Sequence, residues 1–157
     1  TAKIKMDQEA AARAEKARQE QQAREEARRK EWESLNCVIS GSNGITQGYV
    51  RSNGVVENSS HITIGYIKQN GVIENASHIT IGYVLSNGTV EQSNRITLGY
   101  FDGRTFEKSN RITCGYYSSG TFENSNRITI GRFSGKYNQT VIAACFFVFF
   151  FPEEVNK

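Results

Sequence analysis

The chain has 157 residues, enough for about one domain, and its 19 Lys and Arg against 16 Asp and Glu leave a net charge of +3. Both signs are spread along the whole sequence without a basic block, which argues against a nucleic-acid partner. The longest apolar run, residues 141–151, is about half the length that spans a bilayer, so no membrane span is predicted.

Residues 1–36 form the first predicted unit, a long charged α-helix. They consist almost entirely of Ala, Glu, Gln, Arg and Lys, the strongest helix formers, without Gly or Pro. The few large apolar side chains make no continuous coiled-coil seam. Two interpretations stay open: a solvated helix held at its C-terminal end, or a helix that docks on a partner protein or a second copy through Met6, Trp32 and Leu35.

The second unit, residues 37–157, contains a short tandem repeat. A Gly-Tyr pair recurs every 16 or 17 residues, and a Gly-Arg pair follows the last copy. The paired glycines are Gly48, Gly65, Gly82, Gly99 and Gly115, with Gly131 before the Arg. A unit this short cannot bury its own apolar face, so the copies must cover one another.

Each repeat predicts a strand, a tight turn and a second strand. In the copy at residues 79–84, alternation places Ile79, Ile81 and Tyr83 on one face of a strand and Thr80, Gly82 and Val84 on the other. Asn-Gly or Asp-Gly follows at the turn, the strongest local hairpin signal. We therefore predict an all-β domain of five hairpins in a pseudo-fivefold closed assembly, with a stacked β-solenoid as the alternative.

Aligned copies give columns of equivalent residues with two possible roles each. The carboxylates could bind a cation, or simply pair with the basic column four residues later; the tyrosines could stack sugars, or pack inward. The candidate ligand residues are Glu57, Glu74, Glu91, Glu107 and Glu123, with Tyr66, Tyr83, Tyr100 and Tyr116. The basic column is His61, His78, Arg95, Arg111 and Arg127, and its alignment of His with Arg argues against general-base catalysis.

The C-terminal run Val141–Phe151 does not alternate, so both of its faces must be covered. We predict a core strand that crosses the repeat assembly and locks the last copy to the first, with a membrane or partner anchor as the rival. Cys114 aligns with apolar core residues of the other copies. Cys37 and Cys145 could pair in an oxidising compartment.

The repeats and tail together resemble a known family. Ile62–Ile67, residues 70–75, their later copies and the Ala-Ala-Cys-Phe-Phe segment at 143–147 are similar to small exported repeat proteins of Bacteroidetes called five-fold beta-flower proteins. The resemblance covers roughly residues 39–151. It implies a pseudo-fivefold closed β assembly, export to the periplasm or cell surface, and no established activity or functional residues. The long charged helix departs from the short lead associated with the family.

These observations predict a non-catalytic protein without a cofactor. We expect an exported structural or interaction module whose partner is another envelope protein or a second copy, with a carbohydrate-binding module that uses exposed Tyr and Asn/Ser columns as the alternative. A glycan binder should show accessible Tyr rings beside a groove. An assembly protein should bury its Tyr residues and carry an apolar stripe on the helix.

Overall fold

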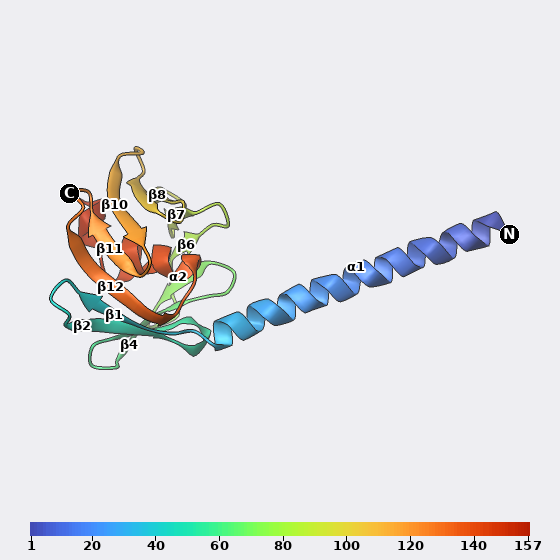
Figure 1. The fold of residues 1–157 in the computed structure, drawn as a ribbon, viewed down its shortest axis with the longest axis horizontal. Coiled ribbons are helices and arrows are strands. Elements are labelled where there is room, and N and C mark those ends of the chain that lie inside the picture. The colour runs from blue at the N-terminus through green and yellow to red at the C-terminus, as the bar shows by residue number, and fades with distance from the viewer.

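A computed structural model describes all residues 1–157 and shows a long helix joined to a closed β-barrel (Figure 1). Helix α1 (Ala2–Glu33) precedes twelve antiparallel strands, and a short helical segment lies inside the ring that they form. The predicted all-β closed assembly with an N-terminal helix is confirmed, and the solenoid alternative is wrong.

The strands follow chain order around the barrel, so each one pairs with its neighbours in sequence. Five hairpins supply ten strands, and β12 pairs with β1 to close the ring. The strands are β1 (Asn36–Gly41), β2 (Thr46–Arg51), β3 (Val55–Asn58), β4 (Thr63–Ile67), β5 (Val72–Asn75), β6 (Thr80–Val84), β7 (Thr89–Gln92), β8 (Thr97–Phe101), β9 (Thr105–Lys108), β10 (Thr113–Ser118), β11 (Thr121–Asn124) and β12 (Thr129–Lys136). A single turn η1 (Ser52–Gly54) joins β2 to β3.

The predicted tight turns join the two strands of each hairpin. Gly71 shows why the turn needs glycine: its φ is +89°, and a Cβ there would lie 2.1 Å from the carbonyl oxygen of Val84. Only a residue without a side chain tolerates both that backbone conformation and that approach. These turns gather at the end of the barrel where α1 is attached (Figure 1).

A β-bulge recurs at the start of the longer strand of each repeat, and it changes the predicted side-chain faces. Between β5 and β6, Glu74 pairs with Thr80 and Ile73 pairs with Gly82, which leaves Ile81 as the extra residue. Ile81 packs against the core, and Gly82 and Val84 are buried, whereas Tyr83 lies on the outer wall. The prediction that Ile81 and Tyr83 share a face was therefore wrong, because a bulge breaks the period of two.

The C-terminal tail fills the barrel, as predicted, but as a helix and not as a strand. It contains α2 (Gln139–Ala144), the π-helical turn η2 (Cys145–Phe149) and α3 (Pro152–Val155). Residues 141–147 are all buried. A strand inside a closed barrel would have no sheet edge to pair with, whereas a helix satisfies its own backbone hydrogen bonds.

Successive tail residues meet successive glycines of the repeat. The column of glycines lines the barrel wall, and a Cβ at most of these positions would lie 2.5–2.8 Å from a Phe ring. The contacts are Phe146 with Gly115, Phe147 with Gly99, Phe149 with Gly65, Phe150 with Gly48 and Phe151 with Gly131. In this order Val148 corresponds to Gly82, where a Cβ would meet no aromatic ring. One step along the tail thus corresponds to one repeat around the barrel.

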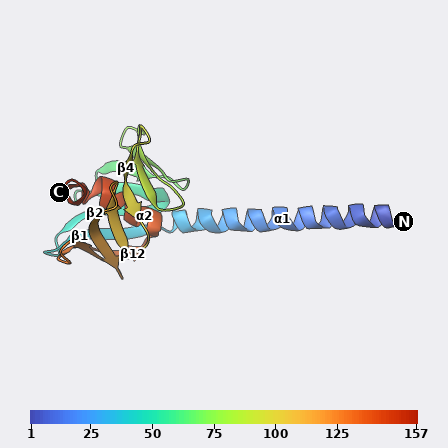
Figure 2. The same cartoon turned by 90° about the horizontal axis from the view of Figure 1, so that it is seen from above.

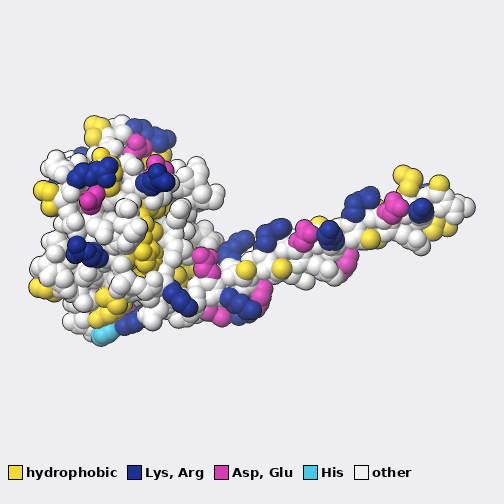
Figure 3. Space-filling model, viewed as in Figure 1, with side chains coloured by type: hydrophobic (Ala, Val, Ile, Leu, Met, Phe, Trp, Pro, Cys, Tyr) yellow, Lys and Arg dark blue, Asp and Glu magenta, His cyan; other side chains and the backbone are white.

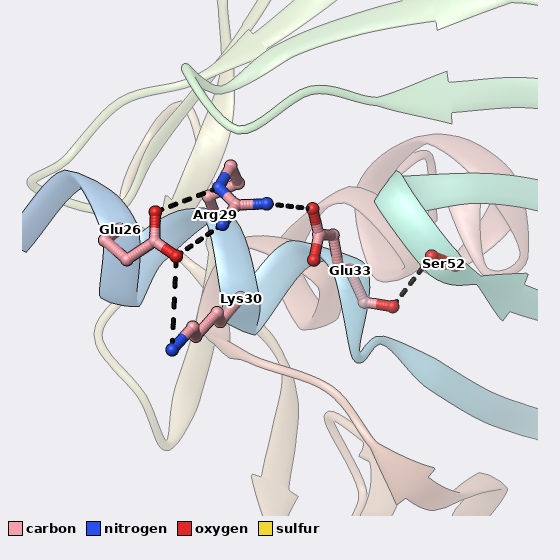
Figure 4. A network of polar contacts seen from close by, with 5 residues as sticks. All are labelled: Glu26, Arg29, Lys30, Glu33 and Ser52. Carbon is pink, nitrogen blue, oxygen red and sulfur yellow. Dashed lines mark hydrogen bonds and ion pairs between the residues drawn. The ribbon is translucent and has the colours of Figure 1, made fainter.

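Helix α1 contacts the barrel only at its C-terminal end. Trp32 is 4% exposed and Leu35 is 2% exposed, and Trp32 covers the turn glycine Gly54. The Ser52 hydroxyl donates to the carbonyl oxygen of Glu33 at 2.7 Å. In Figure 4, Arg29 bridges Glu26 and Glu33 just before this junction.

Helix α1 is about 48 Å long at 1.5 Å per residue, and most of it projects into solvent (Figures 1 and 2). Met6 is 65% exposed near its free end. Trp32 and Leu35, predicted as possible partner contacts, are instead core residues of the barrel, because the chain turns directly from the helix into β1.

The helix should therefore be separable from barrel stability. We expect Ala17→Pro to lower the helical circular dichroism signal at 222 nm, since proline in a helix interior costs about 3 kcal/mol, while leaving the melting temperature of the barrel unchanged. Trp32→Ala should instead lower that temperature, with a loss of about 3 kcal/mol. Equal effects of the two substitutions on the melting temperature would contradict this assignment.

The contact between glycine and phenylalanine can be tested by a matched pair. In Gly99→Ala the new Cβ would meet Phe147 at 2.5 Å, whereas in Gly82→Ala the nearest side-chain atom is 3.8 Å away. In both variants the new Cβ also lies close to a backbone oxygen. The difference between their free energies of unfolding therefore reports the contact with the Phe147 ring. We expect Gly99→Ala to lower the free energy of unfolding, measured in urea, by about 1–3 kcal/mol more than Gly82→Ala does. Equal losses would show that the rings do not require glycine.

Candidate functional surfaces

The Tyr, Glu and basic columns come together in one repeated cluster on the outer wall of the barrel. Tyr83 on β6 is the direct cross-strand partner of Glu91 on β7. Arg95, four residues after Glu91, has a φ of +70°, which turns its side chain back over the sheet. Its guanidinium lies 3.7 Å from the centre of the Tyr83 ring and 3.1 Å from a Glu91 carboxylate oxygen.

The same arrangement occurs five times around the barrel. In the three Arg clusters the guanidinium carbon lies 3.5–3.7 Å from the ring centre, and in the two His clusters the imidazole stacks on the Tyr ring at 4.1–4.3 Å. The clusters are Tyr49–Glu57–His61, Tyr66–Glu74–His78, Tyr83–Glu91–Arg95, Tyr100–Glu107–Arg111 and Tyr116–Glu123–Arg127. Each carboxylate therefore has its own basic partner within the same loop.

This geometry defines what the predicted ligand residues can do. The tyrosines lie on the outer wall and do not pack inward as expected, because the bulge places the neighbouring glycine inside. Each ring of the clusters is already covered by a cation or an imidazole, a contact worth about 0.5–1 kcal/mol at an exposed site. A sugar that stacked on the covered face of these rings would have to displace that group.

Glu74 shows the electrostatics of a cluster most clearly. The hydrogen bond with His78, at 3.0 Å, lowers the pKa of the Glu74 carboxyl below its ordinary 4.5, and the nearby Lys68 acts in the same direction. Burial opposes this shift without reversing it. The ionised carboxylate is thus the form that the cluster stabilises.

A surface that the sequence reasoning missed lies at the end of the barrel opposite α1. Six isoleucines occupy equivalent positions just before the longer strand of each unit, and they are 58–65% exposed. We call them the isoleucine rim: Ile45, Ile62, Ile79, Ile96, Ile112 and Ile128. An isoleucine at a fixed position in every copy was visible in the sequence, but strict alternation assigned it to a strand face.

The remaining predicted features offer less chemistry. Helix α1 has only Trp32 buried and gathers no apolar stripe. None of the helices combines the length and the apolar character that a membrane-spanning helix needs. Cys37, Cys114 and Cys145 are buried free thiols, so Cys37 and Cys145 are not paired here. Burial raises the pKa of Cys37 to about 12 and that of Cys114 to about 11, which makes both poor nucleophiles.

The pairing of Glu74 with His78 gives a prediction about pH. Because folding lowers the pKa of Glu74, its contribution to stability is fully present at pH values above its pKa in the unfolded chain. That contribution is lost as the pH falls through its pKa in the folded chain. His78→Ala should raise the pKa of Glu74 toward 4.5, as followed by carbon NMR of the carboxyl group. The control His61→Ala, in the neighbouring cluster, should leave it unchanged. An unchanged pKa of Glu74 in His78→Ala would refute the pairing.

The closed barrel of hairpin repeats with a Phe-rich plug agrees with the comparison to known families. No curated protein and no solved structure matches the chain. A family model described as 5-fold beta-flower protein matches residues 38–151, which cover the barrel and the Phe-rich part of its plug. The chain therefore belongs to the 5-fold beta-flower protein family.

Proposed function

We propose that this protein is a non-catalytic, exported module that acts by contact with another protein. One observation carries the proposal: the chain's own tail fills the interior of the barrel, with residues 141–147 buried. Barrels that bind small molecules keep a cavity in this place. The surfaces left for a partner are the outer wall, the two ends and helix α1.

The helix supports a structural role. It is polar all round and touches the barrel only near Trp32, and its ion pairs lie within the helix itself. A helix that is polar all round can extend through solvent and separate the parts of a protein that it joins. In this proposal it is a spacer that keeps the barrel at a distance from a partner that contacts the projecting part of the helix.

The carbohydrate alternative has less support from the geometry. Its candidate residues Tyr66, Tyr83, Tyr100 and Tyr116 are covered by His78 or by an Arg side chain. The apolar stripe that we expected on the helix of an assembly protein is also missing. The exposed apolar side chains are instead concentrated on the isoleucine rim, which favours a protein partner over a glycan.

Export, to the periplasm or the cell surface, is part of the proposal and follows from the family resemblance. The thiols are consistent with it. All three are buried, so an oxidising compartment would not cross-link the folded chain through an exposed cysteine.

The proposal can be tested in intact cells of the host with the tagged full-length chain. A membrane-impermeant, amine-reactive crosslinker should reach the lysines of α1 and of the barrel and give a discrete protein adduct on a denaturing gel. A cytoplasmic marker should remain unreacted in the same cells. Reaction only after cell lysis would contradict export, and reaction in intact cells without any protein adduct would contradict the interaction function.

A further inference from the structure

The sixth unit of the barrel lacks the cluster that covers the outer wall of the other five. It is formed by β12 and β1, where the chain closes the ring. Arg132 stands where the other units have Tyr, and its cross-strand partner Ser40 stands where they have Glu. Gly44, four residues after Ser40, takes the place of the basic residue, with a φ of +79° in the same left-handed region. All three members of the cluster therefore differ in this unit.

These replacements leave Arg132 as a cation without an acid. In the three Arg clusters the guanidinium lies 3.1–3.4 Å from a carboxylate oxygen and 3.5–3.7 Å from a Tyr ring centre. Arg132 is exposed and has neither contact. Its cross-strand neighbours Ser40 and Thr121 are half-buried, and their hydroxyl groups make no hydrogen bond within the protein. A Cβ at Gly44 would meet nothing within 4 Å, so the space of the missing basic side chain is open.

The wall around Arg132 is positively charged. Strands β12, β1 and β2 contain Arg132, Lys136 and Arg51 but neither Asp nor Glu. Lys136 is also exposed and unpaired, and the acids of the bordering strands, Glu57 and Glu123, each have a basic partner. In Figure 3 the acidic side chains visible on the barrel lie in its upper half, whereas Lys and Arg also occur in the lower half, over β12 and β1. This sector therefore attracts a negatively charged surface.

We propose that Arg132 and Lys136 are the site at which the barrel binds an acidic surface of another protein, with a partner carboxylate in the place of the missing Glu. The five complete clusters supply the template, since each holds its basic group between a carboxylate and an aromatic ring. A partner Glu or Asp beside an aromatic residue would give Arg132 both contacts, and arginine is a frequent anchor of interfaces for this reason. Lys136 lies four residues further along β12, about 13 Å away, so the partner must present more than one carboxylate.

This site rests on the proposed function of protein contact, and other anionic ligands fit it less well. The outward ring of the sector, Tyr49, already stacks with His61 at 4.3 Å, so a sugar has no free platform on that face. None of the hollows in the surface reaches Arg132 or Lys136, so a small anion would not be enclosed. Binding to an anionic membrane typically uses clusters of about four to eight Lys and Arg, more than this sector carries.

The test is a nuclear magnetic resonance titration of the isotope-labelled full chain with a capped peptide of three Glu-Tyr-Glu-Gly repeats, at up to about 5 mM. We expect saturable shifts of backbone N–H signals in β12 and β1, centred on Arg132 and Ser40. The same peptide with Gln in place of Glu should cause no such shifts. Absence of shifts with the Glu peptide, or equal shifts with the Gln peptide, would overturn the proposal.

Three variants that each lower the net charge by one separate this site from general attraction between charges. Arg132→Ser removes the cation, and Ser40→Glu supplies from the chain itself the carboxylate that the other units have. Both should raise the dissociation constant of the Glu peptide at least about 10-fold. The control Arg104→Ser removes an exposed and unpaired arginine in the turn before β9, and it should leave binding at β12 unchanged. The melting temperature of each variant checks its fold.

Unchanged affinity in both Arg132→Ser and Ser40→Glu would overturn the proposal, as would an equal loss of affinity in Arg104→Ser. Two further probes distinguish the class of ligand. If a sulfated disaccharide or phosphatidylglycerol vesicles shift the same signals with a lower dissociation constant than the Glu peptide, the sector binds a glycan or a membrane and the protein site is wrong.

These outcomes are distinct from failure of the proposed function. In the crosslinking experiment in intact cells, an adduct that is lost in both Arg132→Ser and Ser40→Glu would support the proposed function and this site together. An adduct that persists in both variants would retain the interaction function and place the partner on another surface. Absence of any adduct with the wild-type chain would contradict the interaction function itself.

Discussion

The structure depends on the close contact between the glycine column of the barrel wall and the aromatic tail inside it. A Cβ at Gly99 would lie 2.3 Å from the carbonyl oxygen of Glu107 and 2.5 Å from the Phe147 ring, so the wall and the plug both require glycine there. Interiors pack at the density of organic crystals and do not absorb an extra methyl group without movement. The mid-strand glycines of the repeat are thus the positions at which the wall admits the aromatic core.

The π-helical turn explains how one tail segment satisfies a whole ring. The Phe150 N–H donates to the carbonyl oxygen of Cys145, five residues back, so the turn is wider than that of an α-helix. Consecutive side chains of any helix point in successive directions around its axis, and the wider turn reduces the rotation from one residue to the next, toward the angle between neighbouring units of the barrel. Residues 146–151 accordingly point to successive units of the barrel, and the closing pair of β12 and β1 receives Phe151 against Gly131. The tail thereby ties together hairpins that otherwise contact only their neighbours.

The sequence predicted those parts of the fold that depend on local chemistry. The Gly-Tyr period and the turn at Asn70-Gly71 predicted the hairpins and the closed assembly. The lack of alternation in residues 141–151 predicted that the tail is buried. The helical form of the tail could not be predicted from local sequence, because Phe and Val favour strands. A strand is excluded only because a closed barrel has no free sheet edge inside it. The outward position of Tyr83 and the exposure of Ile79 were missed for one reason: a bulge at Ile81 shifts the alternation, and the period of two contains no sign of it.

The two ends of the barrel differ because the same repeat unit has two kinds of connection. At the end near α1, Gly54, Gly71 and Gly88 lie so close to the carbonyl oxygen of the next strand that a side chain does not fit, and Trp32 covers the turn at Gly54. At the other end an Asn side chain holds each loop open in a fixed shape and leaves an isoleucine in solvent. Repetition places six such isoleucines around this end of the barrel. A single exposed isoleucine would need no explanation, but six at equivalent positions, 58–65% exposed, are a property of the repeat itself.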